Sequence, residues 1–376
     1  MTPRVLHIIN NLDICSVEVW LLQMLAHARQ RDLALDWTFY CAVGQRGQRD
    51  ALARELGANI VYSPVPLGQK LAFARALRAE VSRGGYNVLH SHHDLVSGLY
   101  LAACAGLKLK NIVHVHNPDE SVLTPSRVKQ ALLKPALRRT CLILADTIAA
   151  NSQHSLDTFL AGRSPRPGRD LVHYLGIDSA PFIAVQPDRA QFRRDLGLPE
   201  SAPIMLFAGR MTPEKNPVFV IDVLAALRRR KPEVFCLFAG TGSLEEAVRA
   251  RASELGQEEA VRYLGWRDDI PQIMAACDWF ILPHPEEPPE GFGIVVVEAQ
   301  LAGLRLLLSL GIKDDPLLPT ACERRLSLSD SPEVWAQAAL DLWDTPAPSR
   351  EAALEAFHAS PMDMDFALED MMRLYQ

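Results

Sequence analysis

The sequence predicts an α/β protein of two domains, each with a doubly wound parallel sheet covered by helices on both faces. Three observations lead to this prediction. The 376 residues exceed the length at which one hydrophobic core usually stops growing. Short apolar, β-branched runs alternate with segments of helical spacing in the first half of the chain. The same alternation starts again after a region rich in Pro, Gly and charge, which indicates a second domain of the same kind.

The first half contains six expected strands, in the runs VLHII, WTFYCAV, IVY, NVLH, IVHVH and TIAAN. Helices are expected between them at 17–30, 68–83, 94–105 and 125–140. Because the strands are apolar on both faces, they predict a sheet that is buried on both sides. The pattern breaks at 161–170 and 186–203, and we place the inter-domain region at 176–202.

The second half contains five expected strands, in the runs IMLFAG, VFCLFAG, VRYLG, WFILP and LRLLLS. A helix is expected after each of the first four strands. Residues 331–376 show helical periodicity only, and this tail is expected to pack back on the first domain. The predicted domains are therefore 1–178 plus about 357–376, and 179–356.

Composition and charge narrow the class of protein. The balance of 39 Lys plus Arg against 45 Asp plus Glu argues against a protein whose main task is to coat nucleic acid. The seven cysteines are scattered without a Cys-x-x-Cys pair, which predicts neither a disulfide framework nor a thiolate zinc site. The first apolar run is too short for a signal peptide, and no run approaches the roughly 20 apolar residues that span a bilayer. We expect a soluble, cytoplasmic protein.

Open α/β sheets bind ligands at the carboxyl ends of their strands, so motifs at strand ends matter most. The segment FAGRMTPEKNP follows the first strand of the second domain and carries Arg210 and Lys215 near a helix start. Arg offers a planar fork of donors, Lys a point charge, and the helix dipole favours anions, so this segment is suited to a diphosphate. The alternative is a pair of solvated cations on a loop.

The segment LPHPEEPPEGFGIVVVEAQLAG follows another strand of the same domain. Glu298, one turn inside the expected helix, is suited to accept two hydrogen bonds from a vicinal diol such as a ribose. Glu290 is placed to reach a sugar hydroxyl or a developing positive charge. The backbone N–H groups of Phe292, Gly293 and Ile294 would face a phosphate. The alternative is an acidic loop with a solvated helix residue.

These motifs together resemble the retaining glycosyltransferases of family 4. EGFGIVVVEAQLAG is similar to the E-x7-E signature of that family, and GRMTPEKNP to its G-R-x(4)-K-N element. RVLHIINNLDICSVEVWLLQMLA, HSHHDLVSGLYLAACAG, IVHVHN, LADTIAANSQHS and YLGWRDDIPQIMAACDWFILP occur in matching order, so the resemblance covers nearly the whole chain. The closest likeness is to bacterial transferases of exopolysaccharide assembly. The resemblance implies the GT-B fold, in which two Rossmann-like domains face each other across a cleft, the first binding the acceptor and the second the donor.

The resemblance also implies roles for individual residues. Arg210 and Lys215 would hold the donor diphosphate, Glu298 the nucleotide ribose, and Glu290 the donor sugar. His116, at the end of the strand IVHVH, would touch the donor hexose from the first domain; the alternative is a buried strand-end histidine. The expected catalytic residues are Glu290, His116, Arg210 and Lys215. The expected donor and nucleotide residues are Arg210, Lys215, Gly265, Trp266, Arg267, Phe292, Gly293, Ile294 and Glu298, and the turn at Gly265 to Arg267 would hold the nucleobase.

One loop departs from the family pattern. After the first strand the family usually has a Gly-Gly pair, whereas this chain has Cys15 and Ser16 there, with Glu18 retained. Asp13, Cys15 and Ser16 would form the acceptor or phosphate loop, and the two side chains would crowd it. Either the acceptor is unusual or catalysis is impaired.

Four histidines, His90, His92, His93 and His114, are close enough in sequence to suggest metal ligands. We favour a cleft wall over a metal site, because no carboxylate or cysteine completes a convincing ligand set.

The predicted function is metal-independent transfer of a hexose-type sugar, with retention, from a nucleoside-diphosphate sugar, with UDP as the expected nucleotide. The expected acceptor is a glycan or lipid-linked glycan in polysaccharide biosynthesis, and no cofactor, metal or nucleic acid is expected. The basic amphipathic segment SRVKQALLKPALRRT would rest on an anionic membrane surface at the inner face of the cell membrane, or is a solvated helix. The alternative functions are a catalytically impaired sugar-nucleotide-binding or assembly protein, and a sugar-nucleotide epimerase, against which the paired motifs argue.

Overall fold

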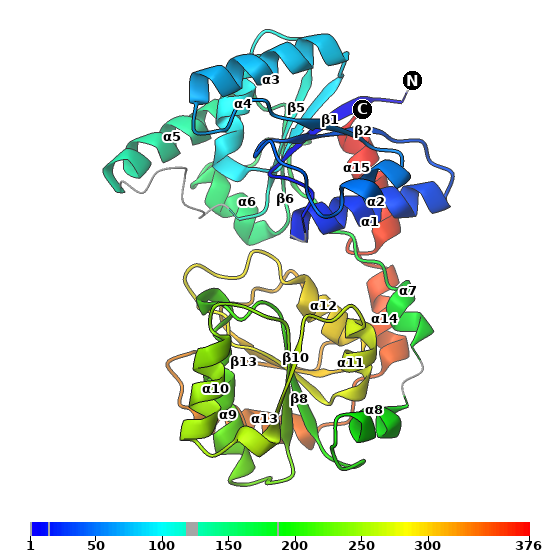
Figure 1. Ribbon diagram of the computed structural model, residues 1–376, viewed down its shortest axis with the longest axis vertical. Helices are drawn as coiled ribbons and strands as arrows, with labels where there is room; N and C mark the ends of the chain where they lie inside the picture. Colours follow the sequence, from blue (N-terminus) through cyan, green and yellow to red (C-terminus); the bar gives the residue numbers. More distant parts are fainter. Residues whose placement is uncertain (1, 14–15, 118–126, 186–187) are drawn as a thin grey trace. The chain divides into compact units, whose positions relative to one another are not determined.

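The computed structural model describes residues 2–13, 16–117, 127–185 and 188–376. The chain forms two compact units (Figure 1). Unit 1 comprises Met1–Asp178 and Pro361–Gln376, and unit 2 comprises Ser179–Ser360. The sequence placed the return of the chain to the first domain at about residue 357, whereas the two units divide after Ser360.

Unit 1 contains a seven-stranded parallel sheet in the order β3-β2-β1-β4-β5-β6-β7. Its strands are β1 (Arg4–Ile9), β2 (Asp36–Cys41), β3 (Asn59–Tyr62), β4 (Val88–Ser91), β5 (Lys110–Val115), β6 (Thr147–Ala150) and β7 (Asp170–Val172). Its helices are α1 (Ser16–Gln30), α2 (Asp50–Glu55), α3 (Lys70–Gly84), α4 (Ser97–Cys104), α5 (Arg127–Leu144), α6 (Gln153–Leu160) and α15 (Met364–Leu374), with a short 3-10 turn η1 (Asp94–Val96) before α4. The edge strand β7 was not predicted, because three residues carry too little periodicity to mark a strand.

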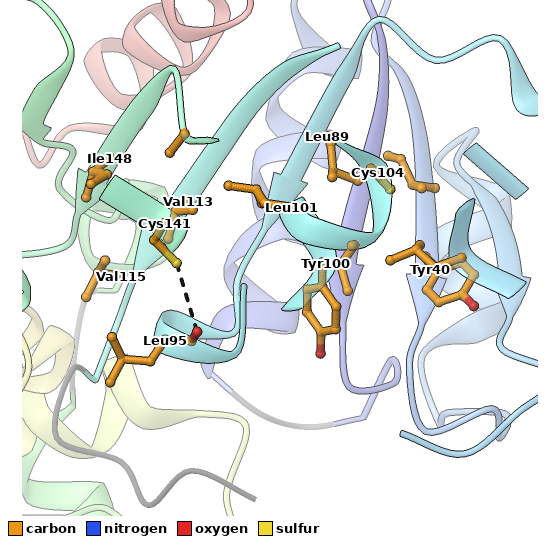
Figure 2. Close-up of a cluster of buried hydrophobic side chains, with 14 of the residues drawn as sticks. Tyr40, Leu89, Leu95, Tyr100, Leu101, Cys104, Val113, Val115, Cys141 and Ile148 are labelled. Carbon is orange, nitrogen blue, oxygen red and sulfur yellow. Dashed lines mark hydrogen bonds between the residues drawn. The ribbon is translucent and has the colours of Figure 1, made fainter. Parts of the chain in front are cut away.

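One face of this sheet is an apolar core (Figure 2). Leu89, Val113 and Ile148 project from neighbouring strands and belong to one buried cluster with Tyr100 and Leu101 of α4. The thiol of Cys141 on α5 lies 3.9 Å from the backbone oxygen of Leu95. The core side chains of β4 and β5 alternate with residues of the opposite face, since successive side chains of a strand point to opposite sides.

The C-terminal helix α15 packs within unit 1, as the sequence predicted for the tail. The backbone N–H of Ile177 donates to the carbonyl of Met362 over 2.9 Å. His27 of α1 lies 2.6 Å from the Asp365 carboxylate at the start of α15. Leu368 and Met371 lie on an apolar stripe of α15, and this stripe is buried. Its burial stabilises the packing of the tail against the rest of unit 1.

Unit 2 contains a six-stranded parallel sheet in the order β10-β9-β8-β11-β12-β13. Its strands are β8 (Ile204–Ala208), β9 (Phe235–Ala239), β10 (Val261–Gly265), β11 (Trp279–Leu282), β12 (Arg305–Ser309) and β13 (Glu323–Leu326). Its helices are α7 (Ala180–Ala184), α8 (Arg189–Asp195), α9 (Pro217–Arg228), α10 (Glu245–Glu254), α11 (Ile270–Ala276), α12 (Ile294–Leu301), α13 (Pro332–Trp343) and α14 (Arg350–His358), and its 3-10 turns are η2 (Pro213–Lys215) and η3 (Glu258–Ala260).

Two parts of unit 2 differ from the sequence prediction. The Pro and charge content of residues 176–202 predicted an inter-domain region. The structure has two short helices there, α7 and α8. The edge strand β13 has the sequence ERRL, which lacks the apolar pattern of a buried strand. It joins the sheet through backbone pairing with β12, which does not depend on side-chain type.

Because every strand of each sheet is parallel to its neighbours, all carboxyl ends of a sheet lie along one edge. Sequence segments that are far apart along the chain are thereby collected at that edge. None of the described helices combines the length and the apolar character that crossing a bilayer requires.

Candidate functional site

The loop after β8 carries the two cations that the sequence singled out. Gly209 has a φ of 149°, a backbone conformation that favours glycine, and Arg210 follows it with an exposed side chain. The turn η2 ends at Lys215, and one residue, Asn216, separates it from the start of α9. The Lys215 ammonium forms an ion pair with the Glu290 carboxylate from the loop after β11. The sequence predicted both residues as functional, and the structure brings them into contact.

The loop that carries Glu290 is held against the turn after β12. The Glu290 N–H donates to the carbonyl of Gly311 over 3.0 Å. A Cβ on Gly311 would lie 2.2 Å from the carbonyl oxygen of Pro285, so only glycine lets the two segments approach this closely. The Ser309 hydroxyl donates to the His284 carbonyl over 2.5 Å. These contacts place the Glu290 carboxylate at the carboxyl edge of the sheet.

His284 is a site residue that the sequence analysis missed. It is buried, and its Nε2 lies 3.7 Å from the same Glu290 oxygen that Lys215 contacts. Burial lowers the pKa of His284, against the opposing effect of the Glu290 charge. Its position two residues after β11, at the strand end of a parallel sheet, is the sequence signal that would have found it.

The electrostatic surroundings keep Glu290 ionised. Burial opposes the charge of the Glu290 carboxylate, but Lys215 and His284 together outweigh it, and the pKa lies below its usual value. Arg210 acts in the same direction. The edge therefore has a negative carboxylate, Glu290, beside two cations, Lys215 and Arg210. The cations suit the phosphate groups of a phosphorylated sugar, and the carboxylate suits its hydroxyl groups.

Helix α12 begins directly after the same loop. Gly293, with a φ of 87°, precedes it, and Glu298 lies on its second turn. Burial raises the pKa of Glu298 to about 7. Among the described residues, no side chain pairs with the Glu298 carboxylate, in contrast to Glu290. A desolvated carboxylate with free acceptor capacity is a suitable partner for a pair of hydroxyl groups.

Three glycine turns pack together at this edge. The N–H of Gly240, which follows β9, donates to the carbonyl of Gly265, the last residue of β10, over 2.8 Å. A Cβ on Gly240 would lie 2.0 Å from the carbonyl oxygen of Gly209. Next to Gly265, the Trp266 side chain is exposed, and Arg267 donates to both oxygens of Asp269 over 2.7 and 2.5 Å. The guanidinium of Arg267 is therefore engaged by its own turn.

His116 follows β5 in unit 1, and its backbone is anchored on three sides. The N–H groups of His116 and Asn117 both donate to Oδ1 of Asp94, over 2.7 and 3.1 Å. The amide of Asn151 donates to the His116 carbonyl over 3.1 Å. Its imidazole Nε2 lies 3.1 Å from Nδ1 of His92. The strand-end histidine is thus held in one orientation by buried polar groups.

The loop with the altered glycine pair lies in the same unit. Asp13 accepts from the Asn11 amide over 2.7 Å and from the Gln48 N–H over 3.0 Å. Cys15 lies outside the described residues, and Ser16 is the first residue of α1. Glu18 is buried in the first turn of α1, and burial raises the pKa of its carboxyl to about 7.

Two family models match the chain. Residues 188–310 match the model of glycosyl transferases group 1, and residues 17–180 match the model of glycosyltransferase family 4. The first match contains Arg210, Lys215, Glu290 and Glu298, and the second contains His116. The two models thus fall on the two halves of the chain.

Relatives and solved structures agree with these matches. The glycosyltransferase EpsF of Bacillus subtilis is 26% identical over 99% of this chain and 96% of that protein. A D-inositol 3-phosphate glycosyltransferase of Salinispora arenicola is 32% identical over 63% of this chain and 57% of that protein. HepE of Anabaena, solved in complex with UDP and glucose, has a TM-score of 0.77 and 20% identity over 99% of this chain and 98% of its own. WaaG, a glycosyltransferase involved in lipopolysaccharide biosynthesis, has a TM-score of 0.73 and 15% identity, covering 99% of both chains.

The two doubly wound sheets, the charged edge of unit 2 and these similarities define a GT-B glycosyltransferase that acts on sugar nucleotides. It is a hexosyltransferase by the same comparisons. Its two halves match models of glycosyl transferases group 1 and of glycosyltransferase family 4, the family that the motifs of its sequence resemble.

Proposed function

We propose that this enzyme transfers a hexose from a UDP-sugar to a hydroxyl group of a glycan or lipid-linked glycan, with retention at the anomeric carbon. The observation that carries the proposal is the Lys215–Glu290 ion pair beside Arg210, at the carboxyl edge of the sheet in unit 2. UDP is the nucleotide in the HepE complexes, and WaaG, which has a similar fold, is involved in lipopolysaccharide biosynthesis.

Departure of the diphosphate is the step that the cations assist. As the bond between the anomeric carbon and the phosphate oxygen lengthens, negative charge grows on the leaving group. Arg210 contributes a planar fork of donors, and Lys215 contributes a mobile point charge. The backbone N–H groups from Phe292 to Ile294, at the start of α12, add donors that need no reorganisation. In this proposal the protein supplies the positive charge and no divalent metal is required.

Glu290 and Glu298 have different roles in this proposal. Glu290 stays ionised beside Lys215 and accepts a hydrogen bond from the donor sugar, which orients the ring and stabilises positive charge at the anomeric carbon. Glu298 accepts the two ribose hydroxyls. The turn from Gly265 through Trp266 to Arg267 holds the base by its backbone, since the Arg267 side chain is engaged by Asp269.

Unit 1 contributes acceptor binding and one side chain in this proposal. His116 contacts the donor hexose, and the loop of Asp13, Cys15 and Ser16 contacts the acceptor or a phosphate. Retention follows when the acceptor hydroxyl attacks from the face that the diphosphate leaves, and its proton passes to the departing phosphate. No carboxylate is then needed as a covalent nucleophile.

A peripheral contact with anionic membranes fits the lipid-linked acceptor. Leu132, Arg139 and Ile143 recur at helical spacing along α5, and their side chains are exposed. An exposed stripe of apolar and basic residues is suited to the lipid interface. Sedimentation with phosphatidylglycerol vesicles tests this: we expect binding that Leu132→Gln with Ile143→Gln abolishes, and equal sedimentation of both proteins would contradict it.

Calorimetric titration with UDP, GDP and ADP, without divalent metal, tests the proposed function. We expect UDP to bind and Arg210→Ala to lose most of this affinity. Arg229→Ala is the matched control, because Arg229 is an exposed arginine that follows the far end of α9 and pairs with Glu333. Slow hydrolysis of the matching UDP-sugar, accelerated by lipid-linked acceptors, would support transfer.

The competing function is a sugar-nucleotide-binding protein in which catalysis is impaired, and the altered loop at Cys15 and Ser16 is what favours it. The same experiment separates the two. Nucleotide binding without donor turnover, even after membrane lipid extracts are added, would favour the impaired protein. Restoring glycine at both positions, Cys15→Gly with Ser16→Gly, would then be expected to restore turnover.

A further inference from the structure

One face of the sheet in unit 1 carries a cluster of histidines that the proposed reaction does not explain. His7 of β1 and His90 of β4 are register partners, and His114 of β5 lies two residues beyond the partner of His90. Paired residues of parallel strands point to the same side, so these histidines share one face, opposite the apolar core. His92 and His116 continue the same alternation past the ends of β4 and β5.

Four of the five imidazoles of the cluster are buried, and His116, at one end, is partly exposed. His7, His90 and His114 have no exposed surface. Trp37 covers His7 at a ring-centroid distance of 4.3 Å, and Trp20 of α1 lies edge-on to His114 at 5.3 Å. Burial lowers the pKa values of His7 and His116 to about 3, and lowers those of His90, His92 and His114 well below the usual value. All five imidazoles are therefore neutral at neutral pH.

The five imidazoles and one phenol form a continuous series of contacts. Nε2 of His116 meets Nδ1 of His92 at 3.1 Å, and Nε2 of His92 meets Nδ1 of His7 at 3.0 Å. Nε2 of His7 meets the Tyr375 hydroxyl at 3.3 Å. That hydroxyl also meets Nδ1 of His90 at 3.1 Å, and Nε2 of His90 meets Nδ1 of His114 at 3.3 Å. We call this series of hydrogen-bonded side chains the hydrogen-bonded chain, and its order is His116, His92, His7, Tyr375, His90, His114.

A metal site is the other structure that such a cluster suggests. Nitrogens of His7, His90 and His92, and those of His92, His114 and His116, lie within 4.8 Å of one another. However, both ring nitrogens of His7, His90 and His92 are already engaged by other members of the chain. Among the described residues, no carboxylate oxygen hydrogen-bonds to these imidazoles to offset the charge of a buried cation. The contacts favour a hydrogen-bonded chain.

Hydrogen counting fixes how the chain is ordered. Each neutral imidazole brings one N–H and Tyr375 brings one O–H, and each contact takes one of these hydrogens. Only one hydrogen is left over for the two chain ends, Nδ1 of His116 and Nε2 of His114, neither of which has a partner among the described residues. If Nδ1 of His116 carries it, every imidazole donates from Nδ1 and Tyr375 donates to His7. If Nε2 of His114 carries it, every imidazole donates from Nε2 and Tyr375 donates to His90.

We propose that these five histidines share one tautomer, set cooperatively through Tyr375, and that Tyr375 is a positioning residue for His116. The two orders differ in which side of each of the five hydrogen bonds carries the hydrogen. They also differ in the position of the one remaining hydrogen, which is on Nδ1 of His116 in one order and on Nε2 of His114 in the other, and both orders have the same net charge. The chain decides whether the free nitrogen of His116 is a donor or an acceptor, and this consequence for transfer rests on the proposed function.

Nuclear magnetic resonance of protein with ¹⁵N-labelled imidazoles tests the shared tautomer directly, without substrate. In the unaltered protein we expect all five histidines to show the same protonated nitrogen, because ring ¹⁵N shifts distinguish Nδ1–H from Nε2–H. A stable mixture, such as His7 protonated on Nδ1 and His90 on Nε2, would overturn the proposal. Stoichiometric shifts of these resonances on addition of Zn²⁺ would overturn it in favour of a metal site.

Tyr375→Phe removes the central hydroxyl and keeps the ring. We expect His116, His92 and His7 to remain coupled to one another, while His90 and His114 become free to adopt the other tautomer. Tyr100→Phe is the matched control, because the buried Tyr100 hydroxyl lies 2.7 Å from Nδ1 of His93, outside the chain. It should change the His93 signals alone. Unchanged tautomers and couplings in Tyr375→Phe would overturn the role of Tyr375.

Kinetics of the same variant separate this proposal from the proposed function. We expect Tyr375→Phe to lower kcat by roughly 10-fold to 100-fold, as is usual when a hydrogen-bond partner that orients a metal-bound imidazole is removed. UDP affinity should stay unchanged, since the nucleotide residues lie in unit 2. An unchanged kcat beside altered tautomers would leave the chain established and remove the role of His116 in transfer. Absence of turnover in the unaltered protein would count against the proposed function alone.

Discussion

The Lys215 ammonium and the Glu290 carboxylate form an ion pair although 75 positions separate them along the chain. Both side chains are largely buried, with 17% and 16% of their surface exposed. Removing one partner leaves the other charge poorly solvated, whereas removing both leaves neither. The pair therefore links the stability of unit 2 to its chemistry.

This pairing predicts different outcomes for stability and for activity. Lys215→Met and Glu290→Gln should each lower the free energy of unfolding by about 1–3 kcal/mol, because each leaves one partly buried charge. The double variant should recover most of that loss. All three variants should lose on the order of 10²-fold or more in donor turnover, as expected when groups that stabilise the transition state are removed.

Chemical denaturation and UDP-sugar hydrolysis check this prediction. Lys215→Met should also weaken UDP binding, while Glu290→Gln should not. Unchanged turnover in both single variants would reject the site, and a double variant as unstable as the sum of the singles would reject the coupling.

Glu298 gives a prediction about pH. Its pKa is raised from 4.5 to about 7, so the folded protein holds this proton more tightly than the unfolded chain does. The stabilisation that this proton provides is complete when the pH is below 4.5, the pKa of the group in the unfolded chain. It is lost as the pH rises through about 7, the pKa in the folded protein. Glu298→Gln, which cannot ionise, should therefore be more stable than the unaltered protein at about pH 8, by roughly 1–3 kcal/mol, and about equal near pH 5.

Thermal unfolding at both pH values measures this difference, and Glu298→Gln should also bind UDP more weakly where Glu298 is ionised. Glu18 has a pKa raised in the same direction, so the comparison must use the difference between the two proteins and not the slope of one. A difference that does not change with pH would contradict the assignment to Glu298.

The glycine turns give a prediction about packing. Gly240→Ala should destabilise unit 2 by about 2–4 kcal/mol, because the new Cβ would lie 2.0 Å from the Gly209 carbonyl oxygen and φ is 138°. Gly256→Ala is the matched control, with a φ of 63° and no atom within 4 Å of its Cβ, and should cost only about 1 kcal/mol. Equal denaturation midpoints for the two variants would show that the contact with Gly209 is unimportant.

Asp94 gives a prediction about the position of His116. Its Oδ1 accepts from two consecutive N–H groups, and its own backbone has a φ of 44°, which Asn tolerates better than Ala. Asp94→Asn keeps an oxygen acceptor and should cost less than about 1 kcal/mol, whereas Asp94→Ala should cost about 2–3 kcal/mol. Denaturation and donor turnover measured on both variants check this, and equal losses would mean that the charge matters and not the acceptor.

Local patterns were enough to predict both sheets and most helices. Strand and helix periodicities are properties of short segments, and the parallel arrangement collects strand ends at one edge, so Arg210, Lys215 and Glu290 were identified from their positions after strands. The short edge strands β7 and β13 were missed because backbone pairing with a neighbour, and not side-chain pattern, forms them. His284 was missed because one histidine after a strand has no periodic signal.

The sequence by itself determined the two-domain α/β class, the resemblance to a family and the strand-end residues, because these follow from local periodicity and from residues at fixed spacing. Only the tertiary structure decided which of these residues meet. It paired Lys215 with Glu290 and joined His7 to His90 through Tyr375, which follows the C-terminal helix α15. Such contacts depend on how separate elements pack in three dimensions, and spacing along one chain contains no information about the distance between them.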